Sequence, residues 1–297
     1  MRKIAILAIA AAAVLASCSA PKEQGAAKKE IGIELYSVRN LIGNPDLFAK
    51  NSEATLKAIA SYGYTSIEAA CYGDGKLYGL SGEDFKTAIE AGGLKVLSSH
   101  VVRYLEDEEI AKHDFSAAME WWKQAIACHK AAGMKYMIAP GINIPENLKD
   151  LKVVCDYMNE IGKLVKENGM MFGYHNHSHE FEEVEGIPAY DFMVQNTDPE
   201  YVFYEMDVYW ADNARVSPVE YFKKYPGRFT CLHIKDVAEV GQSGKVGFDA
   251  IFRNFDISGT KDIVVEMEGS SYSEEDGGIL RTCKESAEYL IAAPFVK

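Results

Sequence analysis

Apolar residues recur along this chain in two alternating rhythms from residue 31 onward. Short, mostly apolar runs, typical of strands buried on both faces of a parallel sheet, appear eight times. Between them, apolar positions repeat every third or fourth residue, as on one face of a helix. The expected strands are residues 32–37, 66–70, 95–99, 136–139, 171–174, 202–206, 231–234 and 263–266.

The helical segments between these runs have recognisable ends. The apolar repeat of residues 148–164 stops at Asn168-Gly169, and Ser217-Pro218 supplies a capping residue with a proline in the first turn. Strands that alternate with such helices form parallel βαβ units. Because the units follow one another without a linker-like break, we predict a single α/β domain, a (β/α)8 TIM barrel. A doubly wound open sheet is the alternative.

The first thirty residues have the features of an export signal rather than of a folded domain. Positive charge at the start is followed by an apolar run over residues 4–15, which is too short to span a bilayer. The Leu-Ala-Ser-Cys sequence that ends at Cys18 resembles a bacterial lipobox. We therefore predict a signal peptide at residues 1–17, a flexible tether from a lipidated Cys18 over residues 18–30, and the barrel at residues 31–297. Such a protein is an exported lipoprotein, anchored in the periplasm or at the cell surface; a secretory signal with an incidental cysteine is the alternative.

The charge balance argues against one class of partner. The formal net charge is −13 and no basic stripe follows residue 30, whereas nucleic-acid binding needs clustered Lys and Arg. No later apolar stretch approaches the ~20 residues of a membrane span, so we expect membrane contact through the lipid anchor alone. The five cysteines after Cys18 include no Cys-x-x-Cys pair, which favours buried free thiols.

Histidines and acids stand where the last four expected strands end. The intervals between these residues are 32, 26 and 33, about one βα unit each, for the series His175, Asp207, His233 and Glu266. A barrel brings the ends of successive strands to one rim. Imidazole and carboxylate ligands together suit Mn, Fe, Co, Zn or Mg. The sequence therefore predicts a divalent metal ion at this rim.

Other polar residues near the strand ends are candidates for acid–base chemistry and substrate contact. The expected proton-transfer groups are Glu180, Glu266, His177 and Lys235. Trp210 suits a wall against a sugar face, and His100 and Glu68 are expected to contact the substrate. The rim offers no serine or cysteine nucleophile with an aligned base, and the chain has no dinucleotide fingerprint. Proton transfer is the chemistry that remains.

Four of these runs resemble those of a known family, the xylose-isomerase-like barrels, also called sugar phosphate isomerases/epimerases and related to endonuclease IV. They are Tyr174-His175-Asn176-His177 with Glu180-Phe181, Met206-Asp207-Val208-Tyr209-Trp210, Leu232-His233-Ile234-Lys235-Asp236 and Val264-Val265-Glu266. The resemblance covers about residues 31–293. It implies a metal-dependent barrel whose ligands are Glu, Asp, His and Glu from strands five to eight, and the last three match Asp207, His233 and Glu266.

The fifth strand departs from the pattern of that family. Where many relatives have a glutamate, this chain has His175, with Glu180 five residues later. Either His175 replaces the missing ligand or Glu180 folds back into the site. The departure also weakens the expectation of a mechanism with two glutamates.

The resemblance implies an enzyme that moves a proton beside the carbonyl of a sugar or keto-sugar. Isomerisation, epimerisation and β-elimination from 3-keto-glycosides share this step, and the expected export favours an unphosphorylated substrate. A non-catalytic glycan-binding lipoprotein on the same fold is the alternative. An endonuclease IV-like repair enzyme is opposed by the acidic charge and the export signal.

Overall fold

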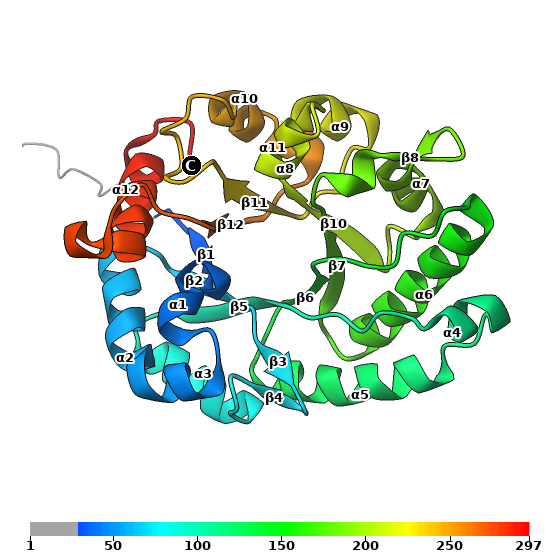
Figure 1. The fold of residues 1–297 in the computed structure, drawn as a ribbon, viewed down its shortest axis with the longest axis horizontal. Helices are drawn as coiled ribbons and strands as arrows, with labels where there is room; N and C mark the ends of the chain where they lie inside the picture. The colour runs from blue at the N-terminus through cyan, green and yellow to red at the C-terminus, as the bar shows by residue number, and fades with distance from the viewer. Residues whose placement is uncertain (1–28, 297) are drawn as a thin grey trace, which may run out of the picture.

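The computed structural model describes residues 29–296 and shows a closed barrel of eight parallel strands (Figure 1). The barrel closes because β1 pairs with both β2 and β12. The TIM-barrel prediction is confirmed, and the open-sheet alternative is wrong. In chain order the strands are β1 (Gly32–Glu34), β2 (Ser66–Ala69), β5 (Lys95–His100), β6 (Tyr136–Ala139), β7 (Met171–His175), β10 (Val202–Asp207), β11 (Cys231–Lys235) and β12 (Asp262–Glu266).

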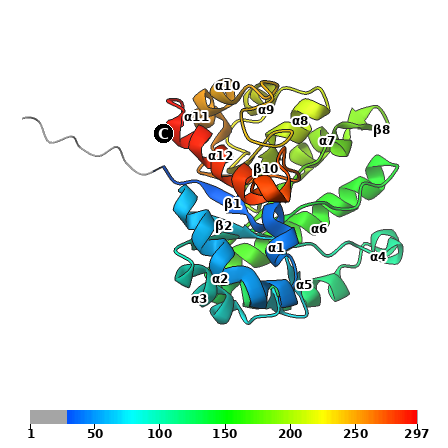
Figure 2. The same cartoon turned by 60° about the vertical axis from the view of Figure 1, so that its left-hand side comes forward.

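Helices surround the strands, with α2, α3 and α5 on one side and α9, α10 and α11 on the other (Figures 1 and 2). None of the helices within residues 29–296 is long and apolar enough to cross a membrane. The longer helices are α2 (Pro45–Tyr62), α3 (Gly82–Ala91), α5 (Ser116–Ala131), α6 (Leu148–Glu167), α7 (Ala189–Asn196), α9 (Pro218–Lys224) and α12 (Gly278–Ala292). The shorter ones are α1 (Arg39–Ile42), α4 (Asp107–Lys112), α8 (Val208–Asn213), α10 (Phe248–Arg253), α11 (Phe255–Ser258) and the 3-10 turns η1 (Leu35–Val38), η2 (His179–Phe181) and η3 (Glu274–Asp276).

Local signals explain where several helices begin. Ser217 accepts a hydrogen bond from the backbone N–H of Glu220 at the start of α9, as its sequence predicts. Two small hairpins interrupt the loops after β2 and β7, formed by β3 (Tyr72–Gly73) with β4 (Lys76–Leu77) and by β8 (Glu183–Val184) with β9 (Ile187–Pro188). The hairpin β8–β9, which follows β7, and α4, which follows β5, extend to the same side of the barrel (Figure 2).

The first strand is shorter than predicted. It ends at Glu34, and η1 follows directly, so the expected strand over residues 32–37 is wrong in its second half. The backbone turns because Ser37 is held against the end of β12, where its hydroxyl oxygen accepts a hydrogen bond of 3.0 Å from the N–H of Met267. This early end leaves Glu34 at the rim of the barrel rather than in mid-strand.

The barrel interior has an apolar floor beneath a polar layer. Tyr136, Ile138, Phe203, Cys231 and Val264 form the buried cluster of the floor. Because side chains alternate along a strand, the next inward positions are occupied by polar residues. These are Glu205 on β10, His233 on β11 and Glu266 on β12, each at most 4% exposed.

Two predictions about the chain outside the site have different outcomes. The five cysteines within residues 29–296 are free thiols, as expected. The signal peptide and the lipidated Cys18 lie outside the described residues and stay predictions.

Candidate metal centre

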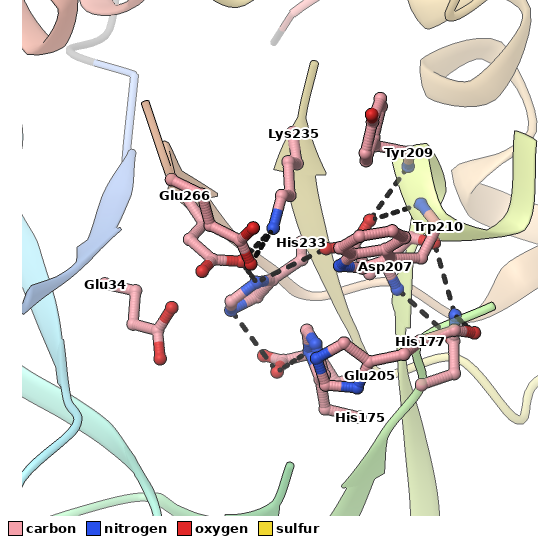
Figure 3. Close-up of polar contacts among 12 residues, drawn as sticks. Glu34, His175, His177, Glu205, Asp207, Tyr209, Trp210, His233, Lys235 and Glu266 are labelled. Carbon is pink, nitrogen blue, oxygen red and sulfur yellow. Dashed lines mark hydrogen bonds and ion pairs between the residues drawn. The ribbon is translucent and has the colours of Figure 1, made fainter. Parts of the chain in front are cut away.

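Four side chains converge at the C-terminal ends of β7, β10, β11 and β12 (Figure 3). Each offers one potential ligand atom, and these atoms all lie within 4.8 Å of one another for the group His175, Asp207, His233 and Glu266. All four are at most 4% exposed. The structure thus brings together the residues that the strand spacing places at one rim.

Two atoms of this group show that a cation fits here. Within residues 29–296, His233 Nδ1 and Asp207 Oδ2 are buried without a hydrogen-bond partner and lie 4.0 Å apart, and Glu266 Oε2 lies 3.4 Å from the same His233 nitrogen. His233 Nε2 lies 2.8 Å from Glu68 Oε1, and with the ring proton on this nitrogen Nδ1 would offer its lone pair to a metal ion. A buried polar atom left unpaired costs about 1–3 kcal/mol, which a shared metal ion would offset. His175 Nδ1 similarly lies 3.2 Å from Glu205 Oε2, leaving its Nε2 as the ligand atom.

The buried carboxylates of the centre favour the binding of positive charge. Burial alone would lower the pKa of His233, but the carboxylates of Glu205, Glu266 and Glu68 outweigh it and raise this pKa well above its usual range. Burial raises the pKa of Asp207 to about 7, although Lys235 and His233 oppose the shift. A proton or a metal ion supplies the missing charge in such a site.

A second group of side chains contacts the two histidines among the candidate ligands. His100 is its hub: Nδ1 lies 2.7 Å from Glu34 Oε1, and Nε2 lies 3.1 Å from both Glu68 Oε1 and Glu205 Oε2. Glu68 is fully buried against the two histidines His100 and His233 and is not part of the cavity wall. Of the two expected substrate contacts, His100 lines the cavity, whereas Glu68 does not and instead contacts His233 and His100.

A cavity of about 240 Å³ opens above this centre. It is lined by Glu34, Tyr36, Ala70, His100, Pro140, His175, His177, Glu266 and Glu268. Lys235 lies beside it, 3.0 Å from Glu266 Oε2 and 2.6 Å from Glu268 Oε1, and its ammonium stands 4.9 Å from the ring centre of Trp210. Burial would lower the pKa of Lys235, but these carboxylates and Asp207 raise it, so the side chain remains a cation.

Glu180 lies outside the group of four. It is fully buried, with Oε1 accepting from the Tyr174 hydroxyl at 2.7 Å and Oε2 accepting from the backbone N–H of His177 at 2.9 Å. Of the two candidates for the strand-five ligand, the structure brings His175 into the group and uses Glu180 to fix the loop that follows. The expected roles of Glu180 as ligand or proton-transfer group do not match this placement.

His177 and Trp210 form one wall of the site. Their ring centres are 5.7 Å apart, and burial lowers the pKa of His177, which favours its neutral form. The indole Nε1 of Trp210 is buried and has no hydrogen-bond partner among the described residues. It can therefore donate to a substrate oxygen as well as pack against a sugar face.

Sequence reasoning missed two carboxylates of this site, Glu34 and Glu205. Burial raises the pKa of Glu34 to about 7, against the opposing effect of His100. Glu34 ends the otherwise apolar strand Gly32–Glu34, and Glu205 lies between Tyr204 and Met206 within Val202–Asp207. A charged residue within such a strand is a signal of an inward-facing polar layer, because an unpaired buried carboxylate would be too costly elsewhere.

Comparison with known proteins defines the class. The profile of the xylose isomerase-like TIM barrel family matches residues 56–292, so the chain belongs to this family. Two crystal structures of sugar phosphate isomerases/epimerases from Parabacteroides distasonis ATCC 8503 are 32% and 37% identical, with TM-scores of 0.81 and 0.79. They cover 93% and 91% of this chain, and all of each of those chains is matched.

Two more distant relatives match this chain at lower sequence identity. An inosose dehydratase from Clostridium botulinum is 26% identical over 205 residues, which is 65% of this chain and 66%, just under two thirds, of that relative. The crystal structure of the IOLI protein with a bound zinc atom is 17% identical, with a TM-score of 0.63 over 90% of this chain and 99% of its own. At that identity the likeness concerns the fold alone.

Proposed function

We propose that this protein is a metal-dependent carbohydrate isomerase, epimerase or lyase that removes a proton beside the carbonyl of an unphosphorylated sugar or keto-sugar. The observation that carries the proposal is a pair of buried atoms, Asp207 Oδ2 and His233 Nδ1, which lie 4.0 Å apart beside a cavity of about 240 Å³ and have no hydrogen-bond partner among the described residues. His175, Asp207, His233 and Glu266 would hold the ion. A bound divalent ion would polarise a carbonyl and stabilise the negative charge that develops as the proton leaves.

The chain's own residues provide the remaining parts of such a reaction. Lys235 presents a buried ammonium that can donate to a substrate oxygen, and Trp210 offers a buried N–H. Neutral His177 and the carboxylate of Glu266 line the same cavity and can accept or return protons. The names of the relatives, isomerase/epimerase and dehydratase, support this range of reactions, which share the first proton transfer.

The charges around the cavity favour an unphosphorylated substrate. Three carboxylates line it, from Glu34, Glu266 and Glu268, while Lys235 is engaged by two of them. The residues that line the cavity include no arginine or lysine that could pair with a phosphate dianion. Export by the predicted signal peptide agrees with this substrate class. If Cys18 carries the lipid anchor, a Cys18→Ser variant should move the protein from the membrane to the soluble fraction.

The proposal is tested by supplying Mn, Co, Mg, Fe or Zn to metal-stripped protein and assaying aldoses, ketoses and 3-keto-glycosides in heavy water. We expect new product, and deuterium at the carbon beside the carbonyl, only with metal present. Full retention of the substrate hydrogen in a product would indicate a hydride shift instead. Binding without product or exchange for every compound would favour the alternative, a non-catalytic glycan-binding protein.

A further inference from the structure

We propose that Glu34 is the base that removes the proton beside the substrate carbonyl, with His100 as its positioning partner. This inference rests on the proposed function and names the residue that performs its first step. Glu34 is not among the site residues predicted from the sequence, and the structure places it at the rim by ending β1 early.

The position of Glu34 suits contact with substrate. It is the last residue of β1, only 2% exposed, and it lines the cavity together with His100 on one wall. Figure 3 shows its carboxylate facing the centre from the side of β1, across from Asp207, Trp210 and His177. A sugar between these walls would present one face to Glu34 and the other to the indole.

Among the carboxylates of the described residues that line the cavity, Glu34 is the one without a lysine partner. Glu266 and Glu268 both pair with Lys235. Glu34 instead forms an ion pair with His100, in which His100 Nδ1 lies 2.7 Å from Glu34 Oε1. The ring of His100 is fixed from its other side by Glu68 and Glu205, so it holds one oxygen of Glu34 while the second remains for substrate.

This assignment also accounts for the departure of the fifth strand. A mechanism with two carboxylates would place one of them on β7, but this strand ends in His175, whose Nδ1 is engaged by Glu205. The next candidate along the chain, Glu180, is turned to Tyr174 and the backbone of His177. The carboxylate that β7 lacks is therefore supplied by Glu34 at the end of β1.

The step balances within the cavity. Glu34 takes the proton as the C–H bond breaks and an O–H bond forms, and the bonding pair moves toward the carbonyl oxygen to give an enolate-type anion. Return of the proton to the opposite face of the same carbon gives epimerisation, and its delivery to the former carbonyl carbon, with transfer of the neighbouring hydroxyl proton to the enolate oxygen, gives isomerisation. In elimination the anion expels an oxygen group from the next carbon, which takes up the proton and leaves as water or an alcohol. No oxidant or reductant is needed, and the same first step serves isomerisation, epimerisation and elimination.

An affinity label tests the proposal without knowledge of the natural substrate. Bromohydroxyacetone is a small uncharged ketone, and a carboxylate beside the carbon next to its carbonyl displaces bromide to form an ester. We expect manganese-loaded protein to carry the ester on Glu34, located by peptide mass spectrometry. Absence of the ester from Glu34, wherever else the reagent attaches, overturns the proposal.

Two variants with a matched control complete the test. Glu34→Gln should keep its manganese content and lose cavity labelling, and Glu34→Asp, which shortens the side chain, should show the same pattern if the glutamine variant folds poorly. Glu30→Gln, at an exposed glutamate before β1, should behave like the wild type. For any compound that the wild type turns over, Glu34→Gln should be slower by roughly 10²–10⁴-fold, and an unchanged rate overturns the proposal. Failure of the wild type on every compound would instead refute the proposed function, while the label still reports on Glu34.

Discussion

At the scale of single residues, Asp207 divides two tasks between its two oxygens. Oδ1 accepts from the backbone N–H groups of Tyr209 and Trp210, both at 2.9 Å, and so caps α8. Oδ2 has no hydrogen-bond partner among residues 29–296 and lies 4.0 Å from His233 Nδ1. The helix cap and the metal site are therefore separable by substitution.

We predict that Asp207→Ala loses both the metal and the cap, whereas Asp207→Asn loses most of the metal but keeps a cap acceptor. The cap contributes about 1 kcal/mol, so only the alanine variant should show that loss in urea unfolding of the metal-free proteins. Metal content is measured by elemental analysis after dialysis. His233→Ala should resemble Asp207→Asn in metal content. Full metal occupancy in all three variants would contradict the site.

His175 and Glu180 should respond differently to truncation, because one faces the centre and the other faces away from it. His175→Ala removes an atom from the group of four and should lower metal content. Glu180→Ala leaves the Tyr174 hydroxyl without its acceptor and frees the backbone of His177, so it should retain metal and unfold about 1–3 kcal/mol more easily. Loss of metal from the Glu180 variant with retention in the His175 variant would reverse the assignment.

At the scale of elements, β7 and β10 pack closely beneath the site, where Phe203 lies against Gly173. A Cβ added at Gly173 would lie 2.5 Å from the ring of Phe203, which belongs to the apolar floor. This position is two residues from His175 on the same strand. The strand that carries a ligand therefore depends on the absence of a side chain below it.

We predict that Gly173→Ala destabilises the protein by about 1–3 kcal/mol, because the aromatic ring and the strand must shift to admit the methyl group. Weaker metal binding should accompany this loss, since His175 moves with β7. Gly247→Ala serves as the control, because nothing lies within 4 Å of its added Cβ and its φ is −80°. Equal unfolding midpoints for the two variants in urea would show that the floor is looser than the contacts indicate.

Also at this scale, the eight strands and the rim position of the four candidate ligands could be predicted because they depend on local periodicity and on the length of one βα unit. The early end of β1 could not, since it depends on Ser37 meeting Met267 across 230 positions of sequence. The contacts of His100 could not be predicted for the same reason, because its partner Glu205 is 105 positions away in the sequence. Sequence spacing predicts which residues reach the rim, but not which of them pair there.

At the scale of the whole molecule, the structure concentrates negative charge in the centre of a protein that is already acidic. The chain carries a formal net charge of −13, and Glu34, Glu68, Glu205, Asp207 and Glu266 are buried around three histidines and one lysine, His100, His175, His233 and Lys235. Carboxylates packed at this density repel one another unless cations are bound between them. Folding and metal binding should therefore be linked.

Removal of the metal should lower the thermal stability of the wild type. An ion present at a hundred times its dissociation constant stabilises the folded state by about 2.7 kcal/mol, which corresponds to roughly 5–10 °C in Tm for a domain of this size. The measurement compares protein stripped with a chelator and then dialysed, before and after addition of manganese or zinc.

Asp207→Asn is the control, because its folded state retains the barrel and the helix cap but lacks the negative charge that faces His233 Nδ1. Its Tm should change little on addition of metal. An equal upward shift in both proteins would mean that the ion binds elsewhere, and no shift in the wild type with any of the candidate metals would count against a metal centre at this rim.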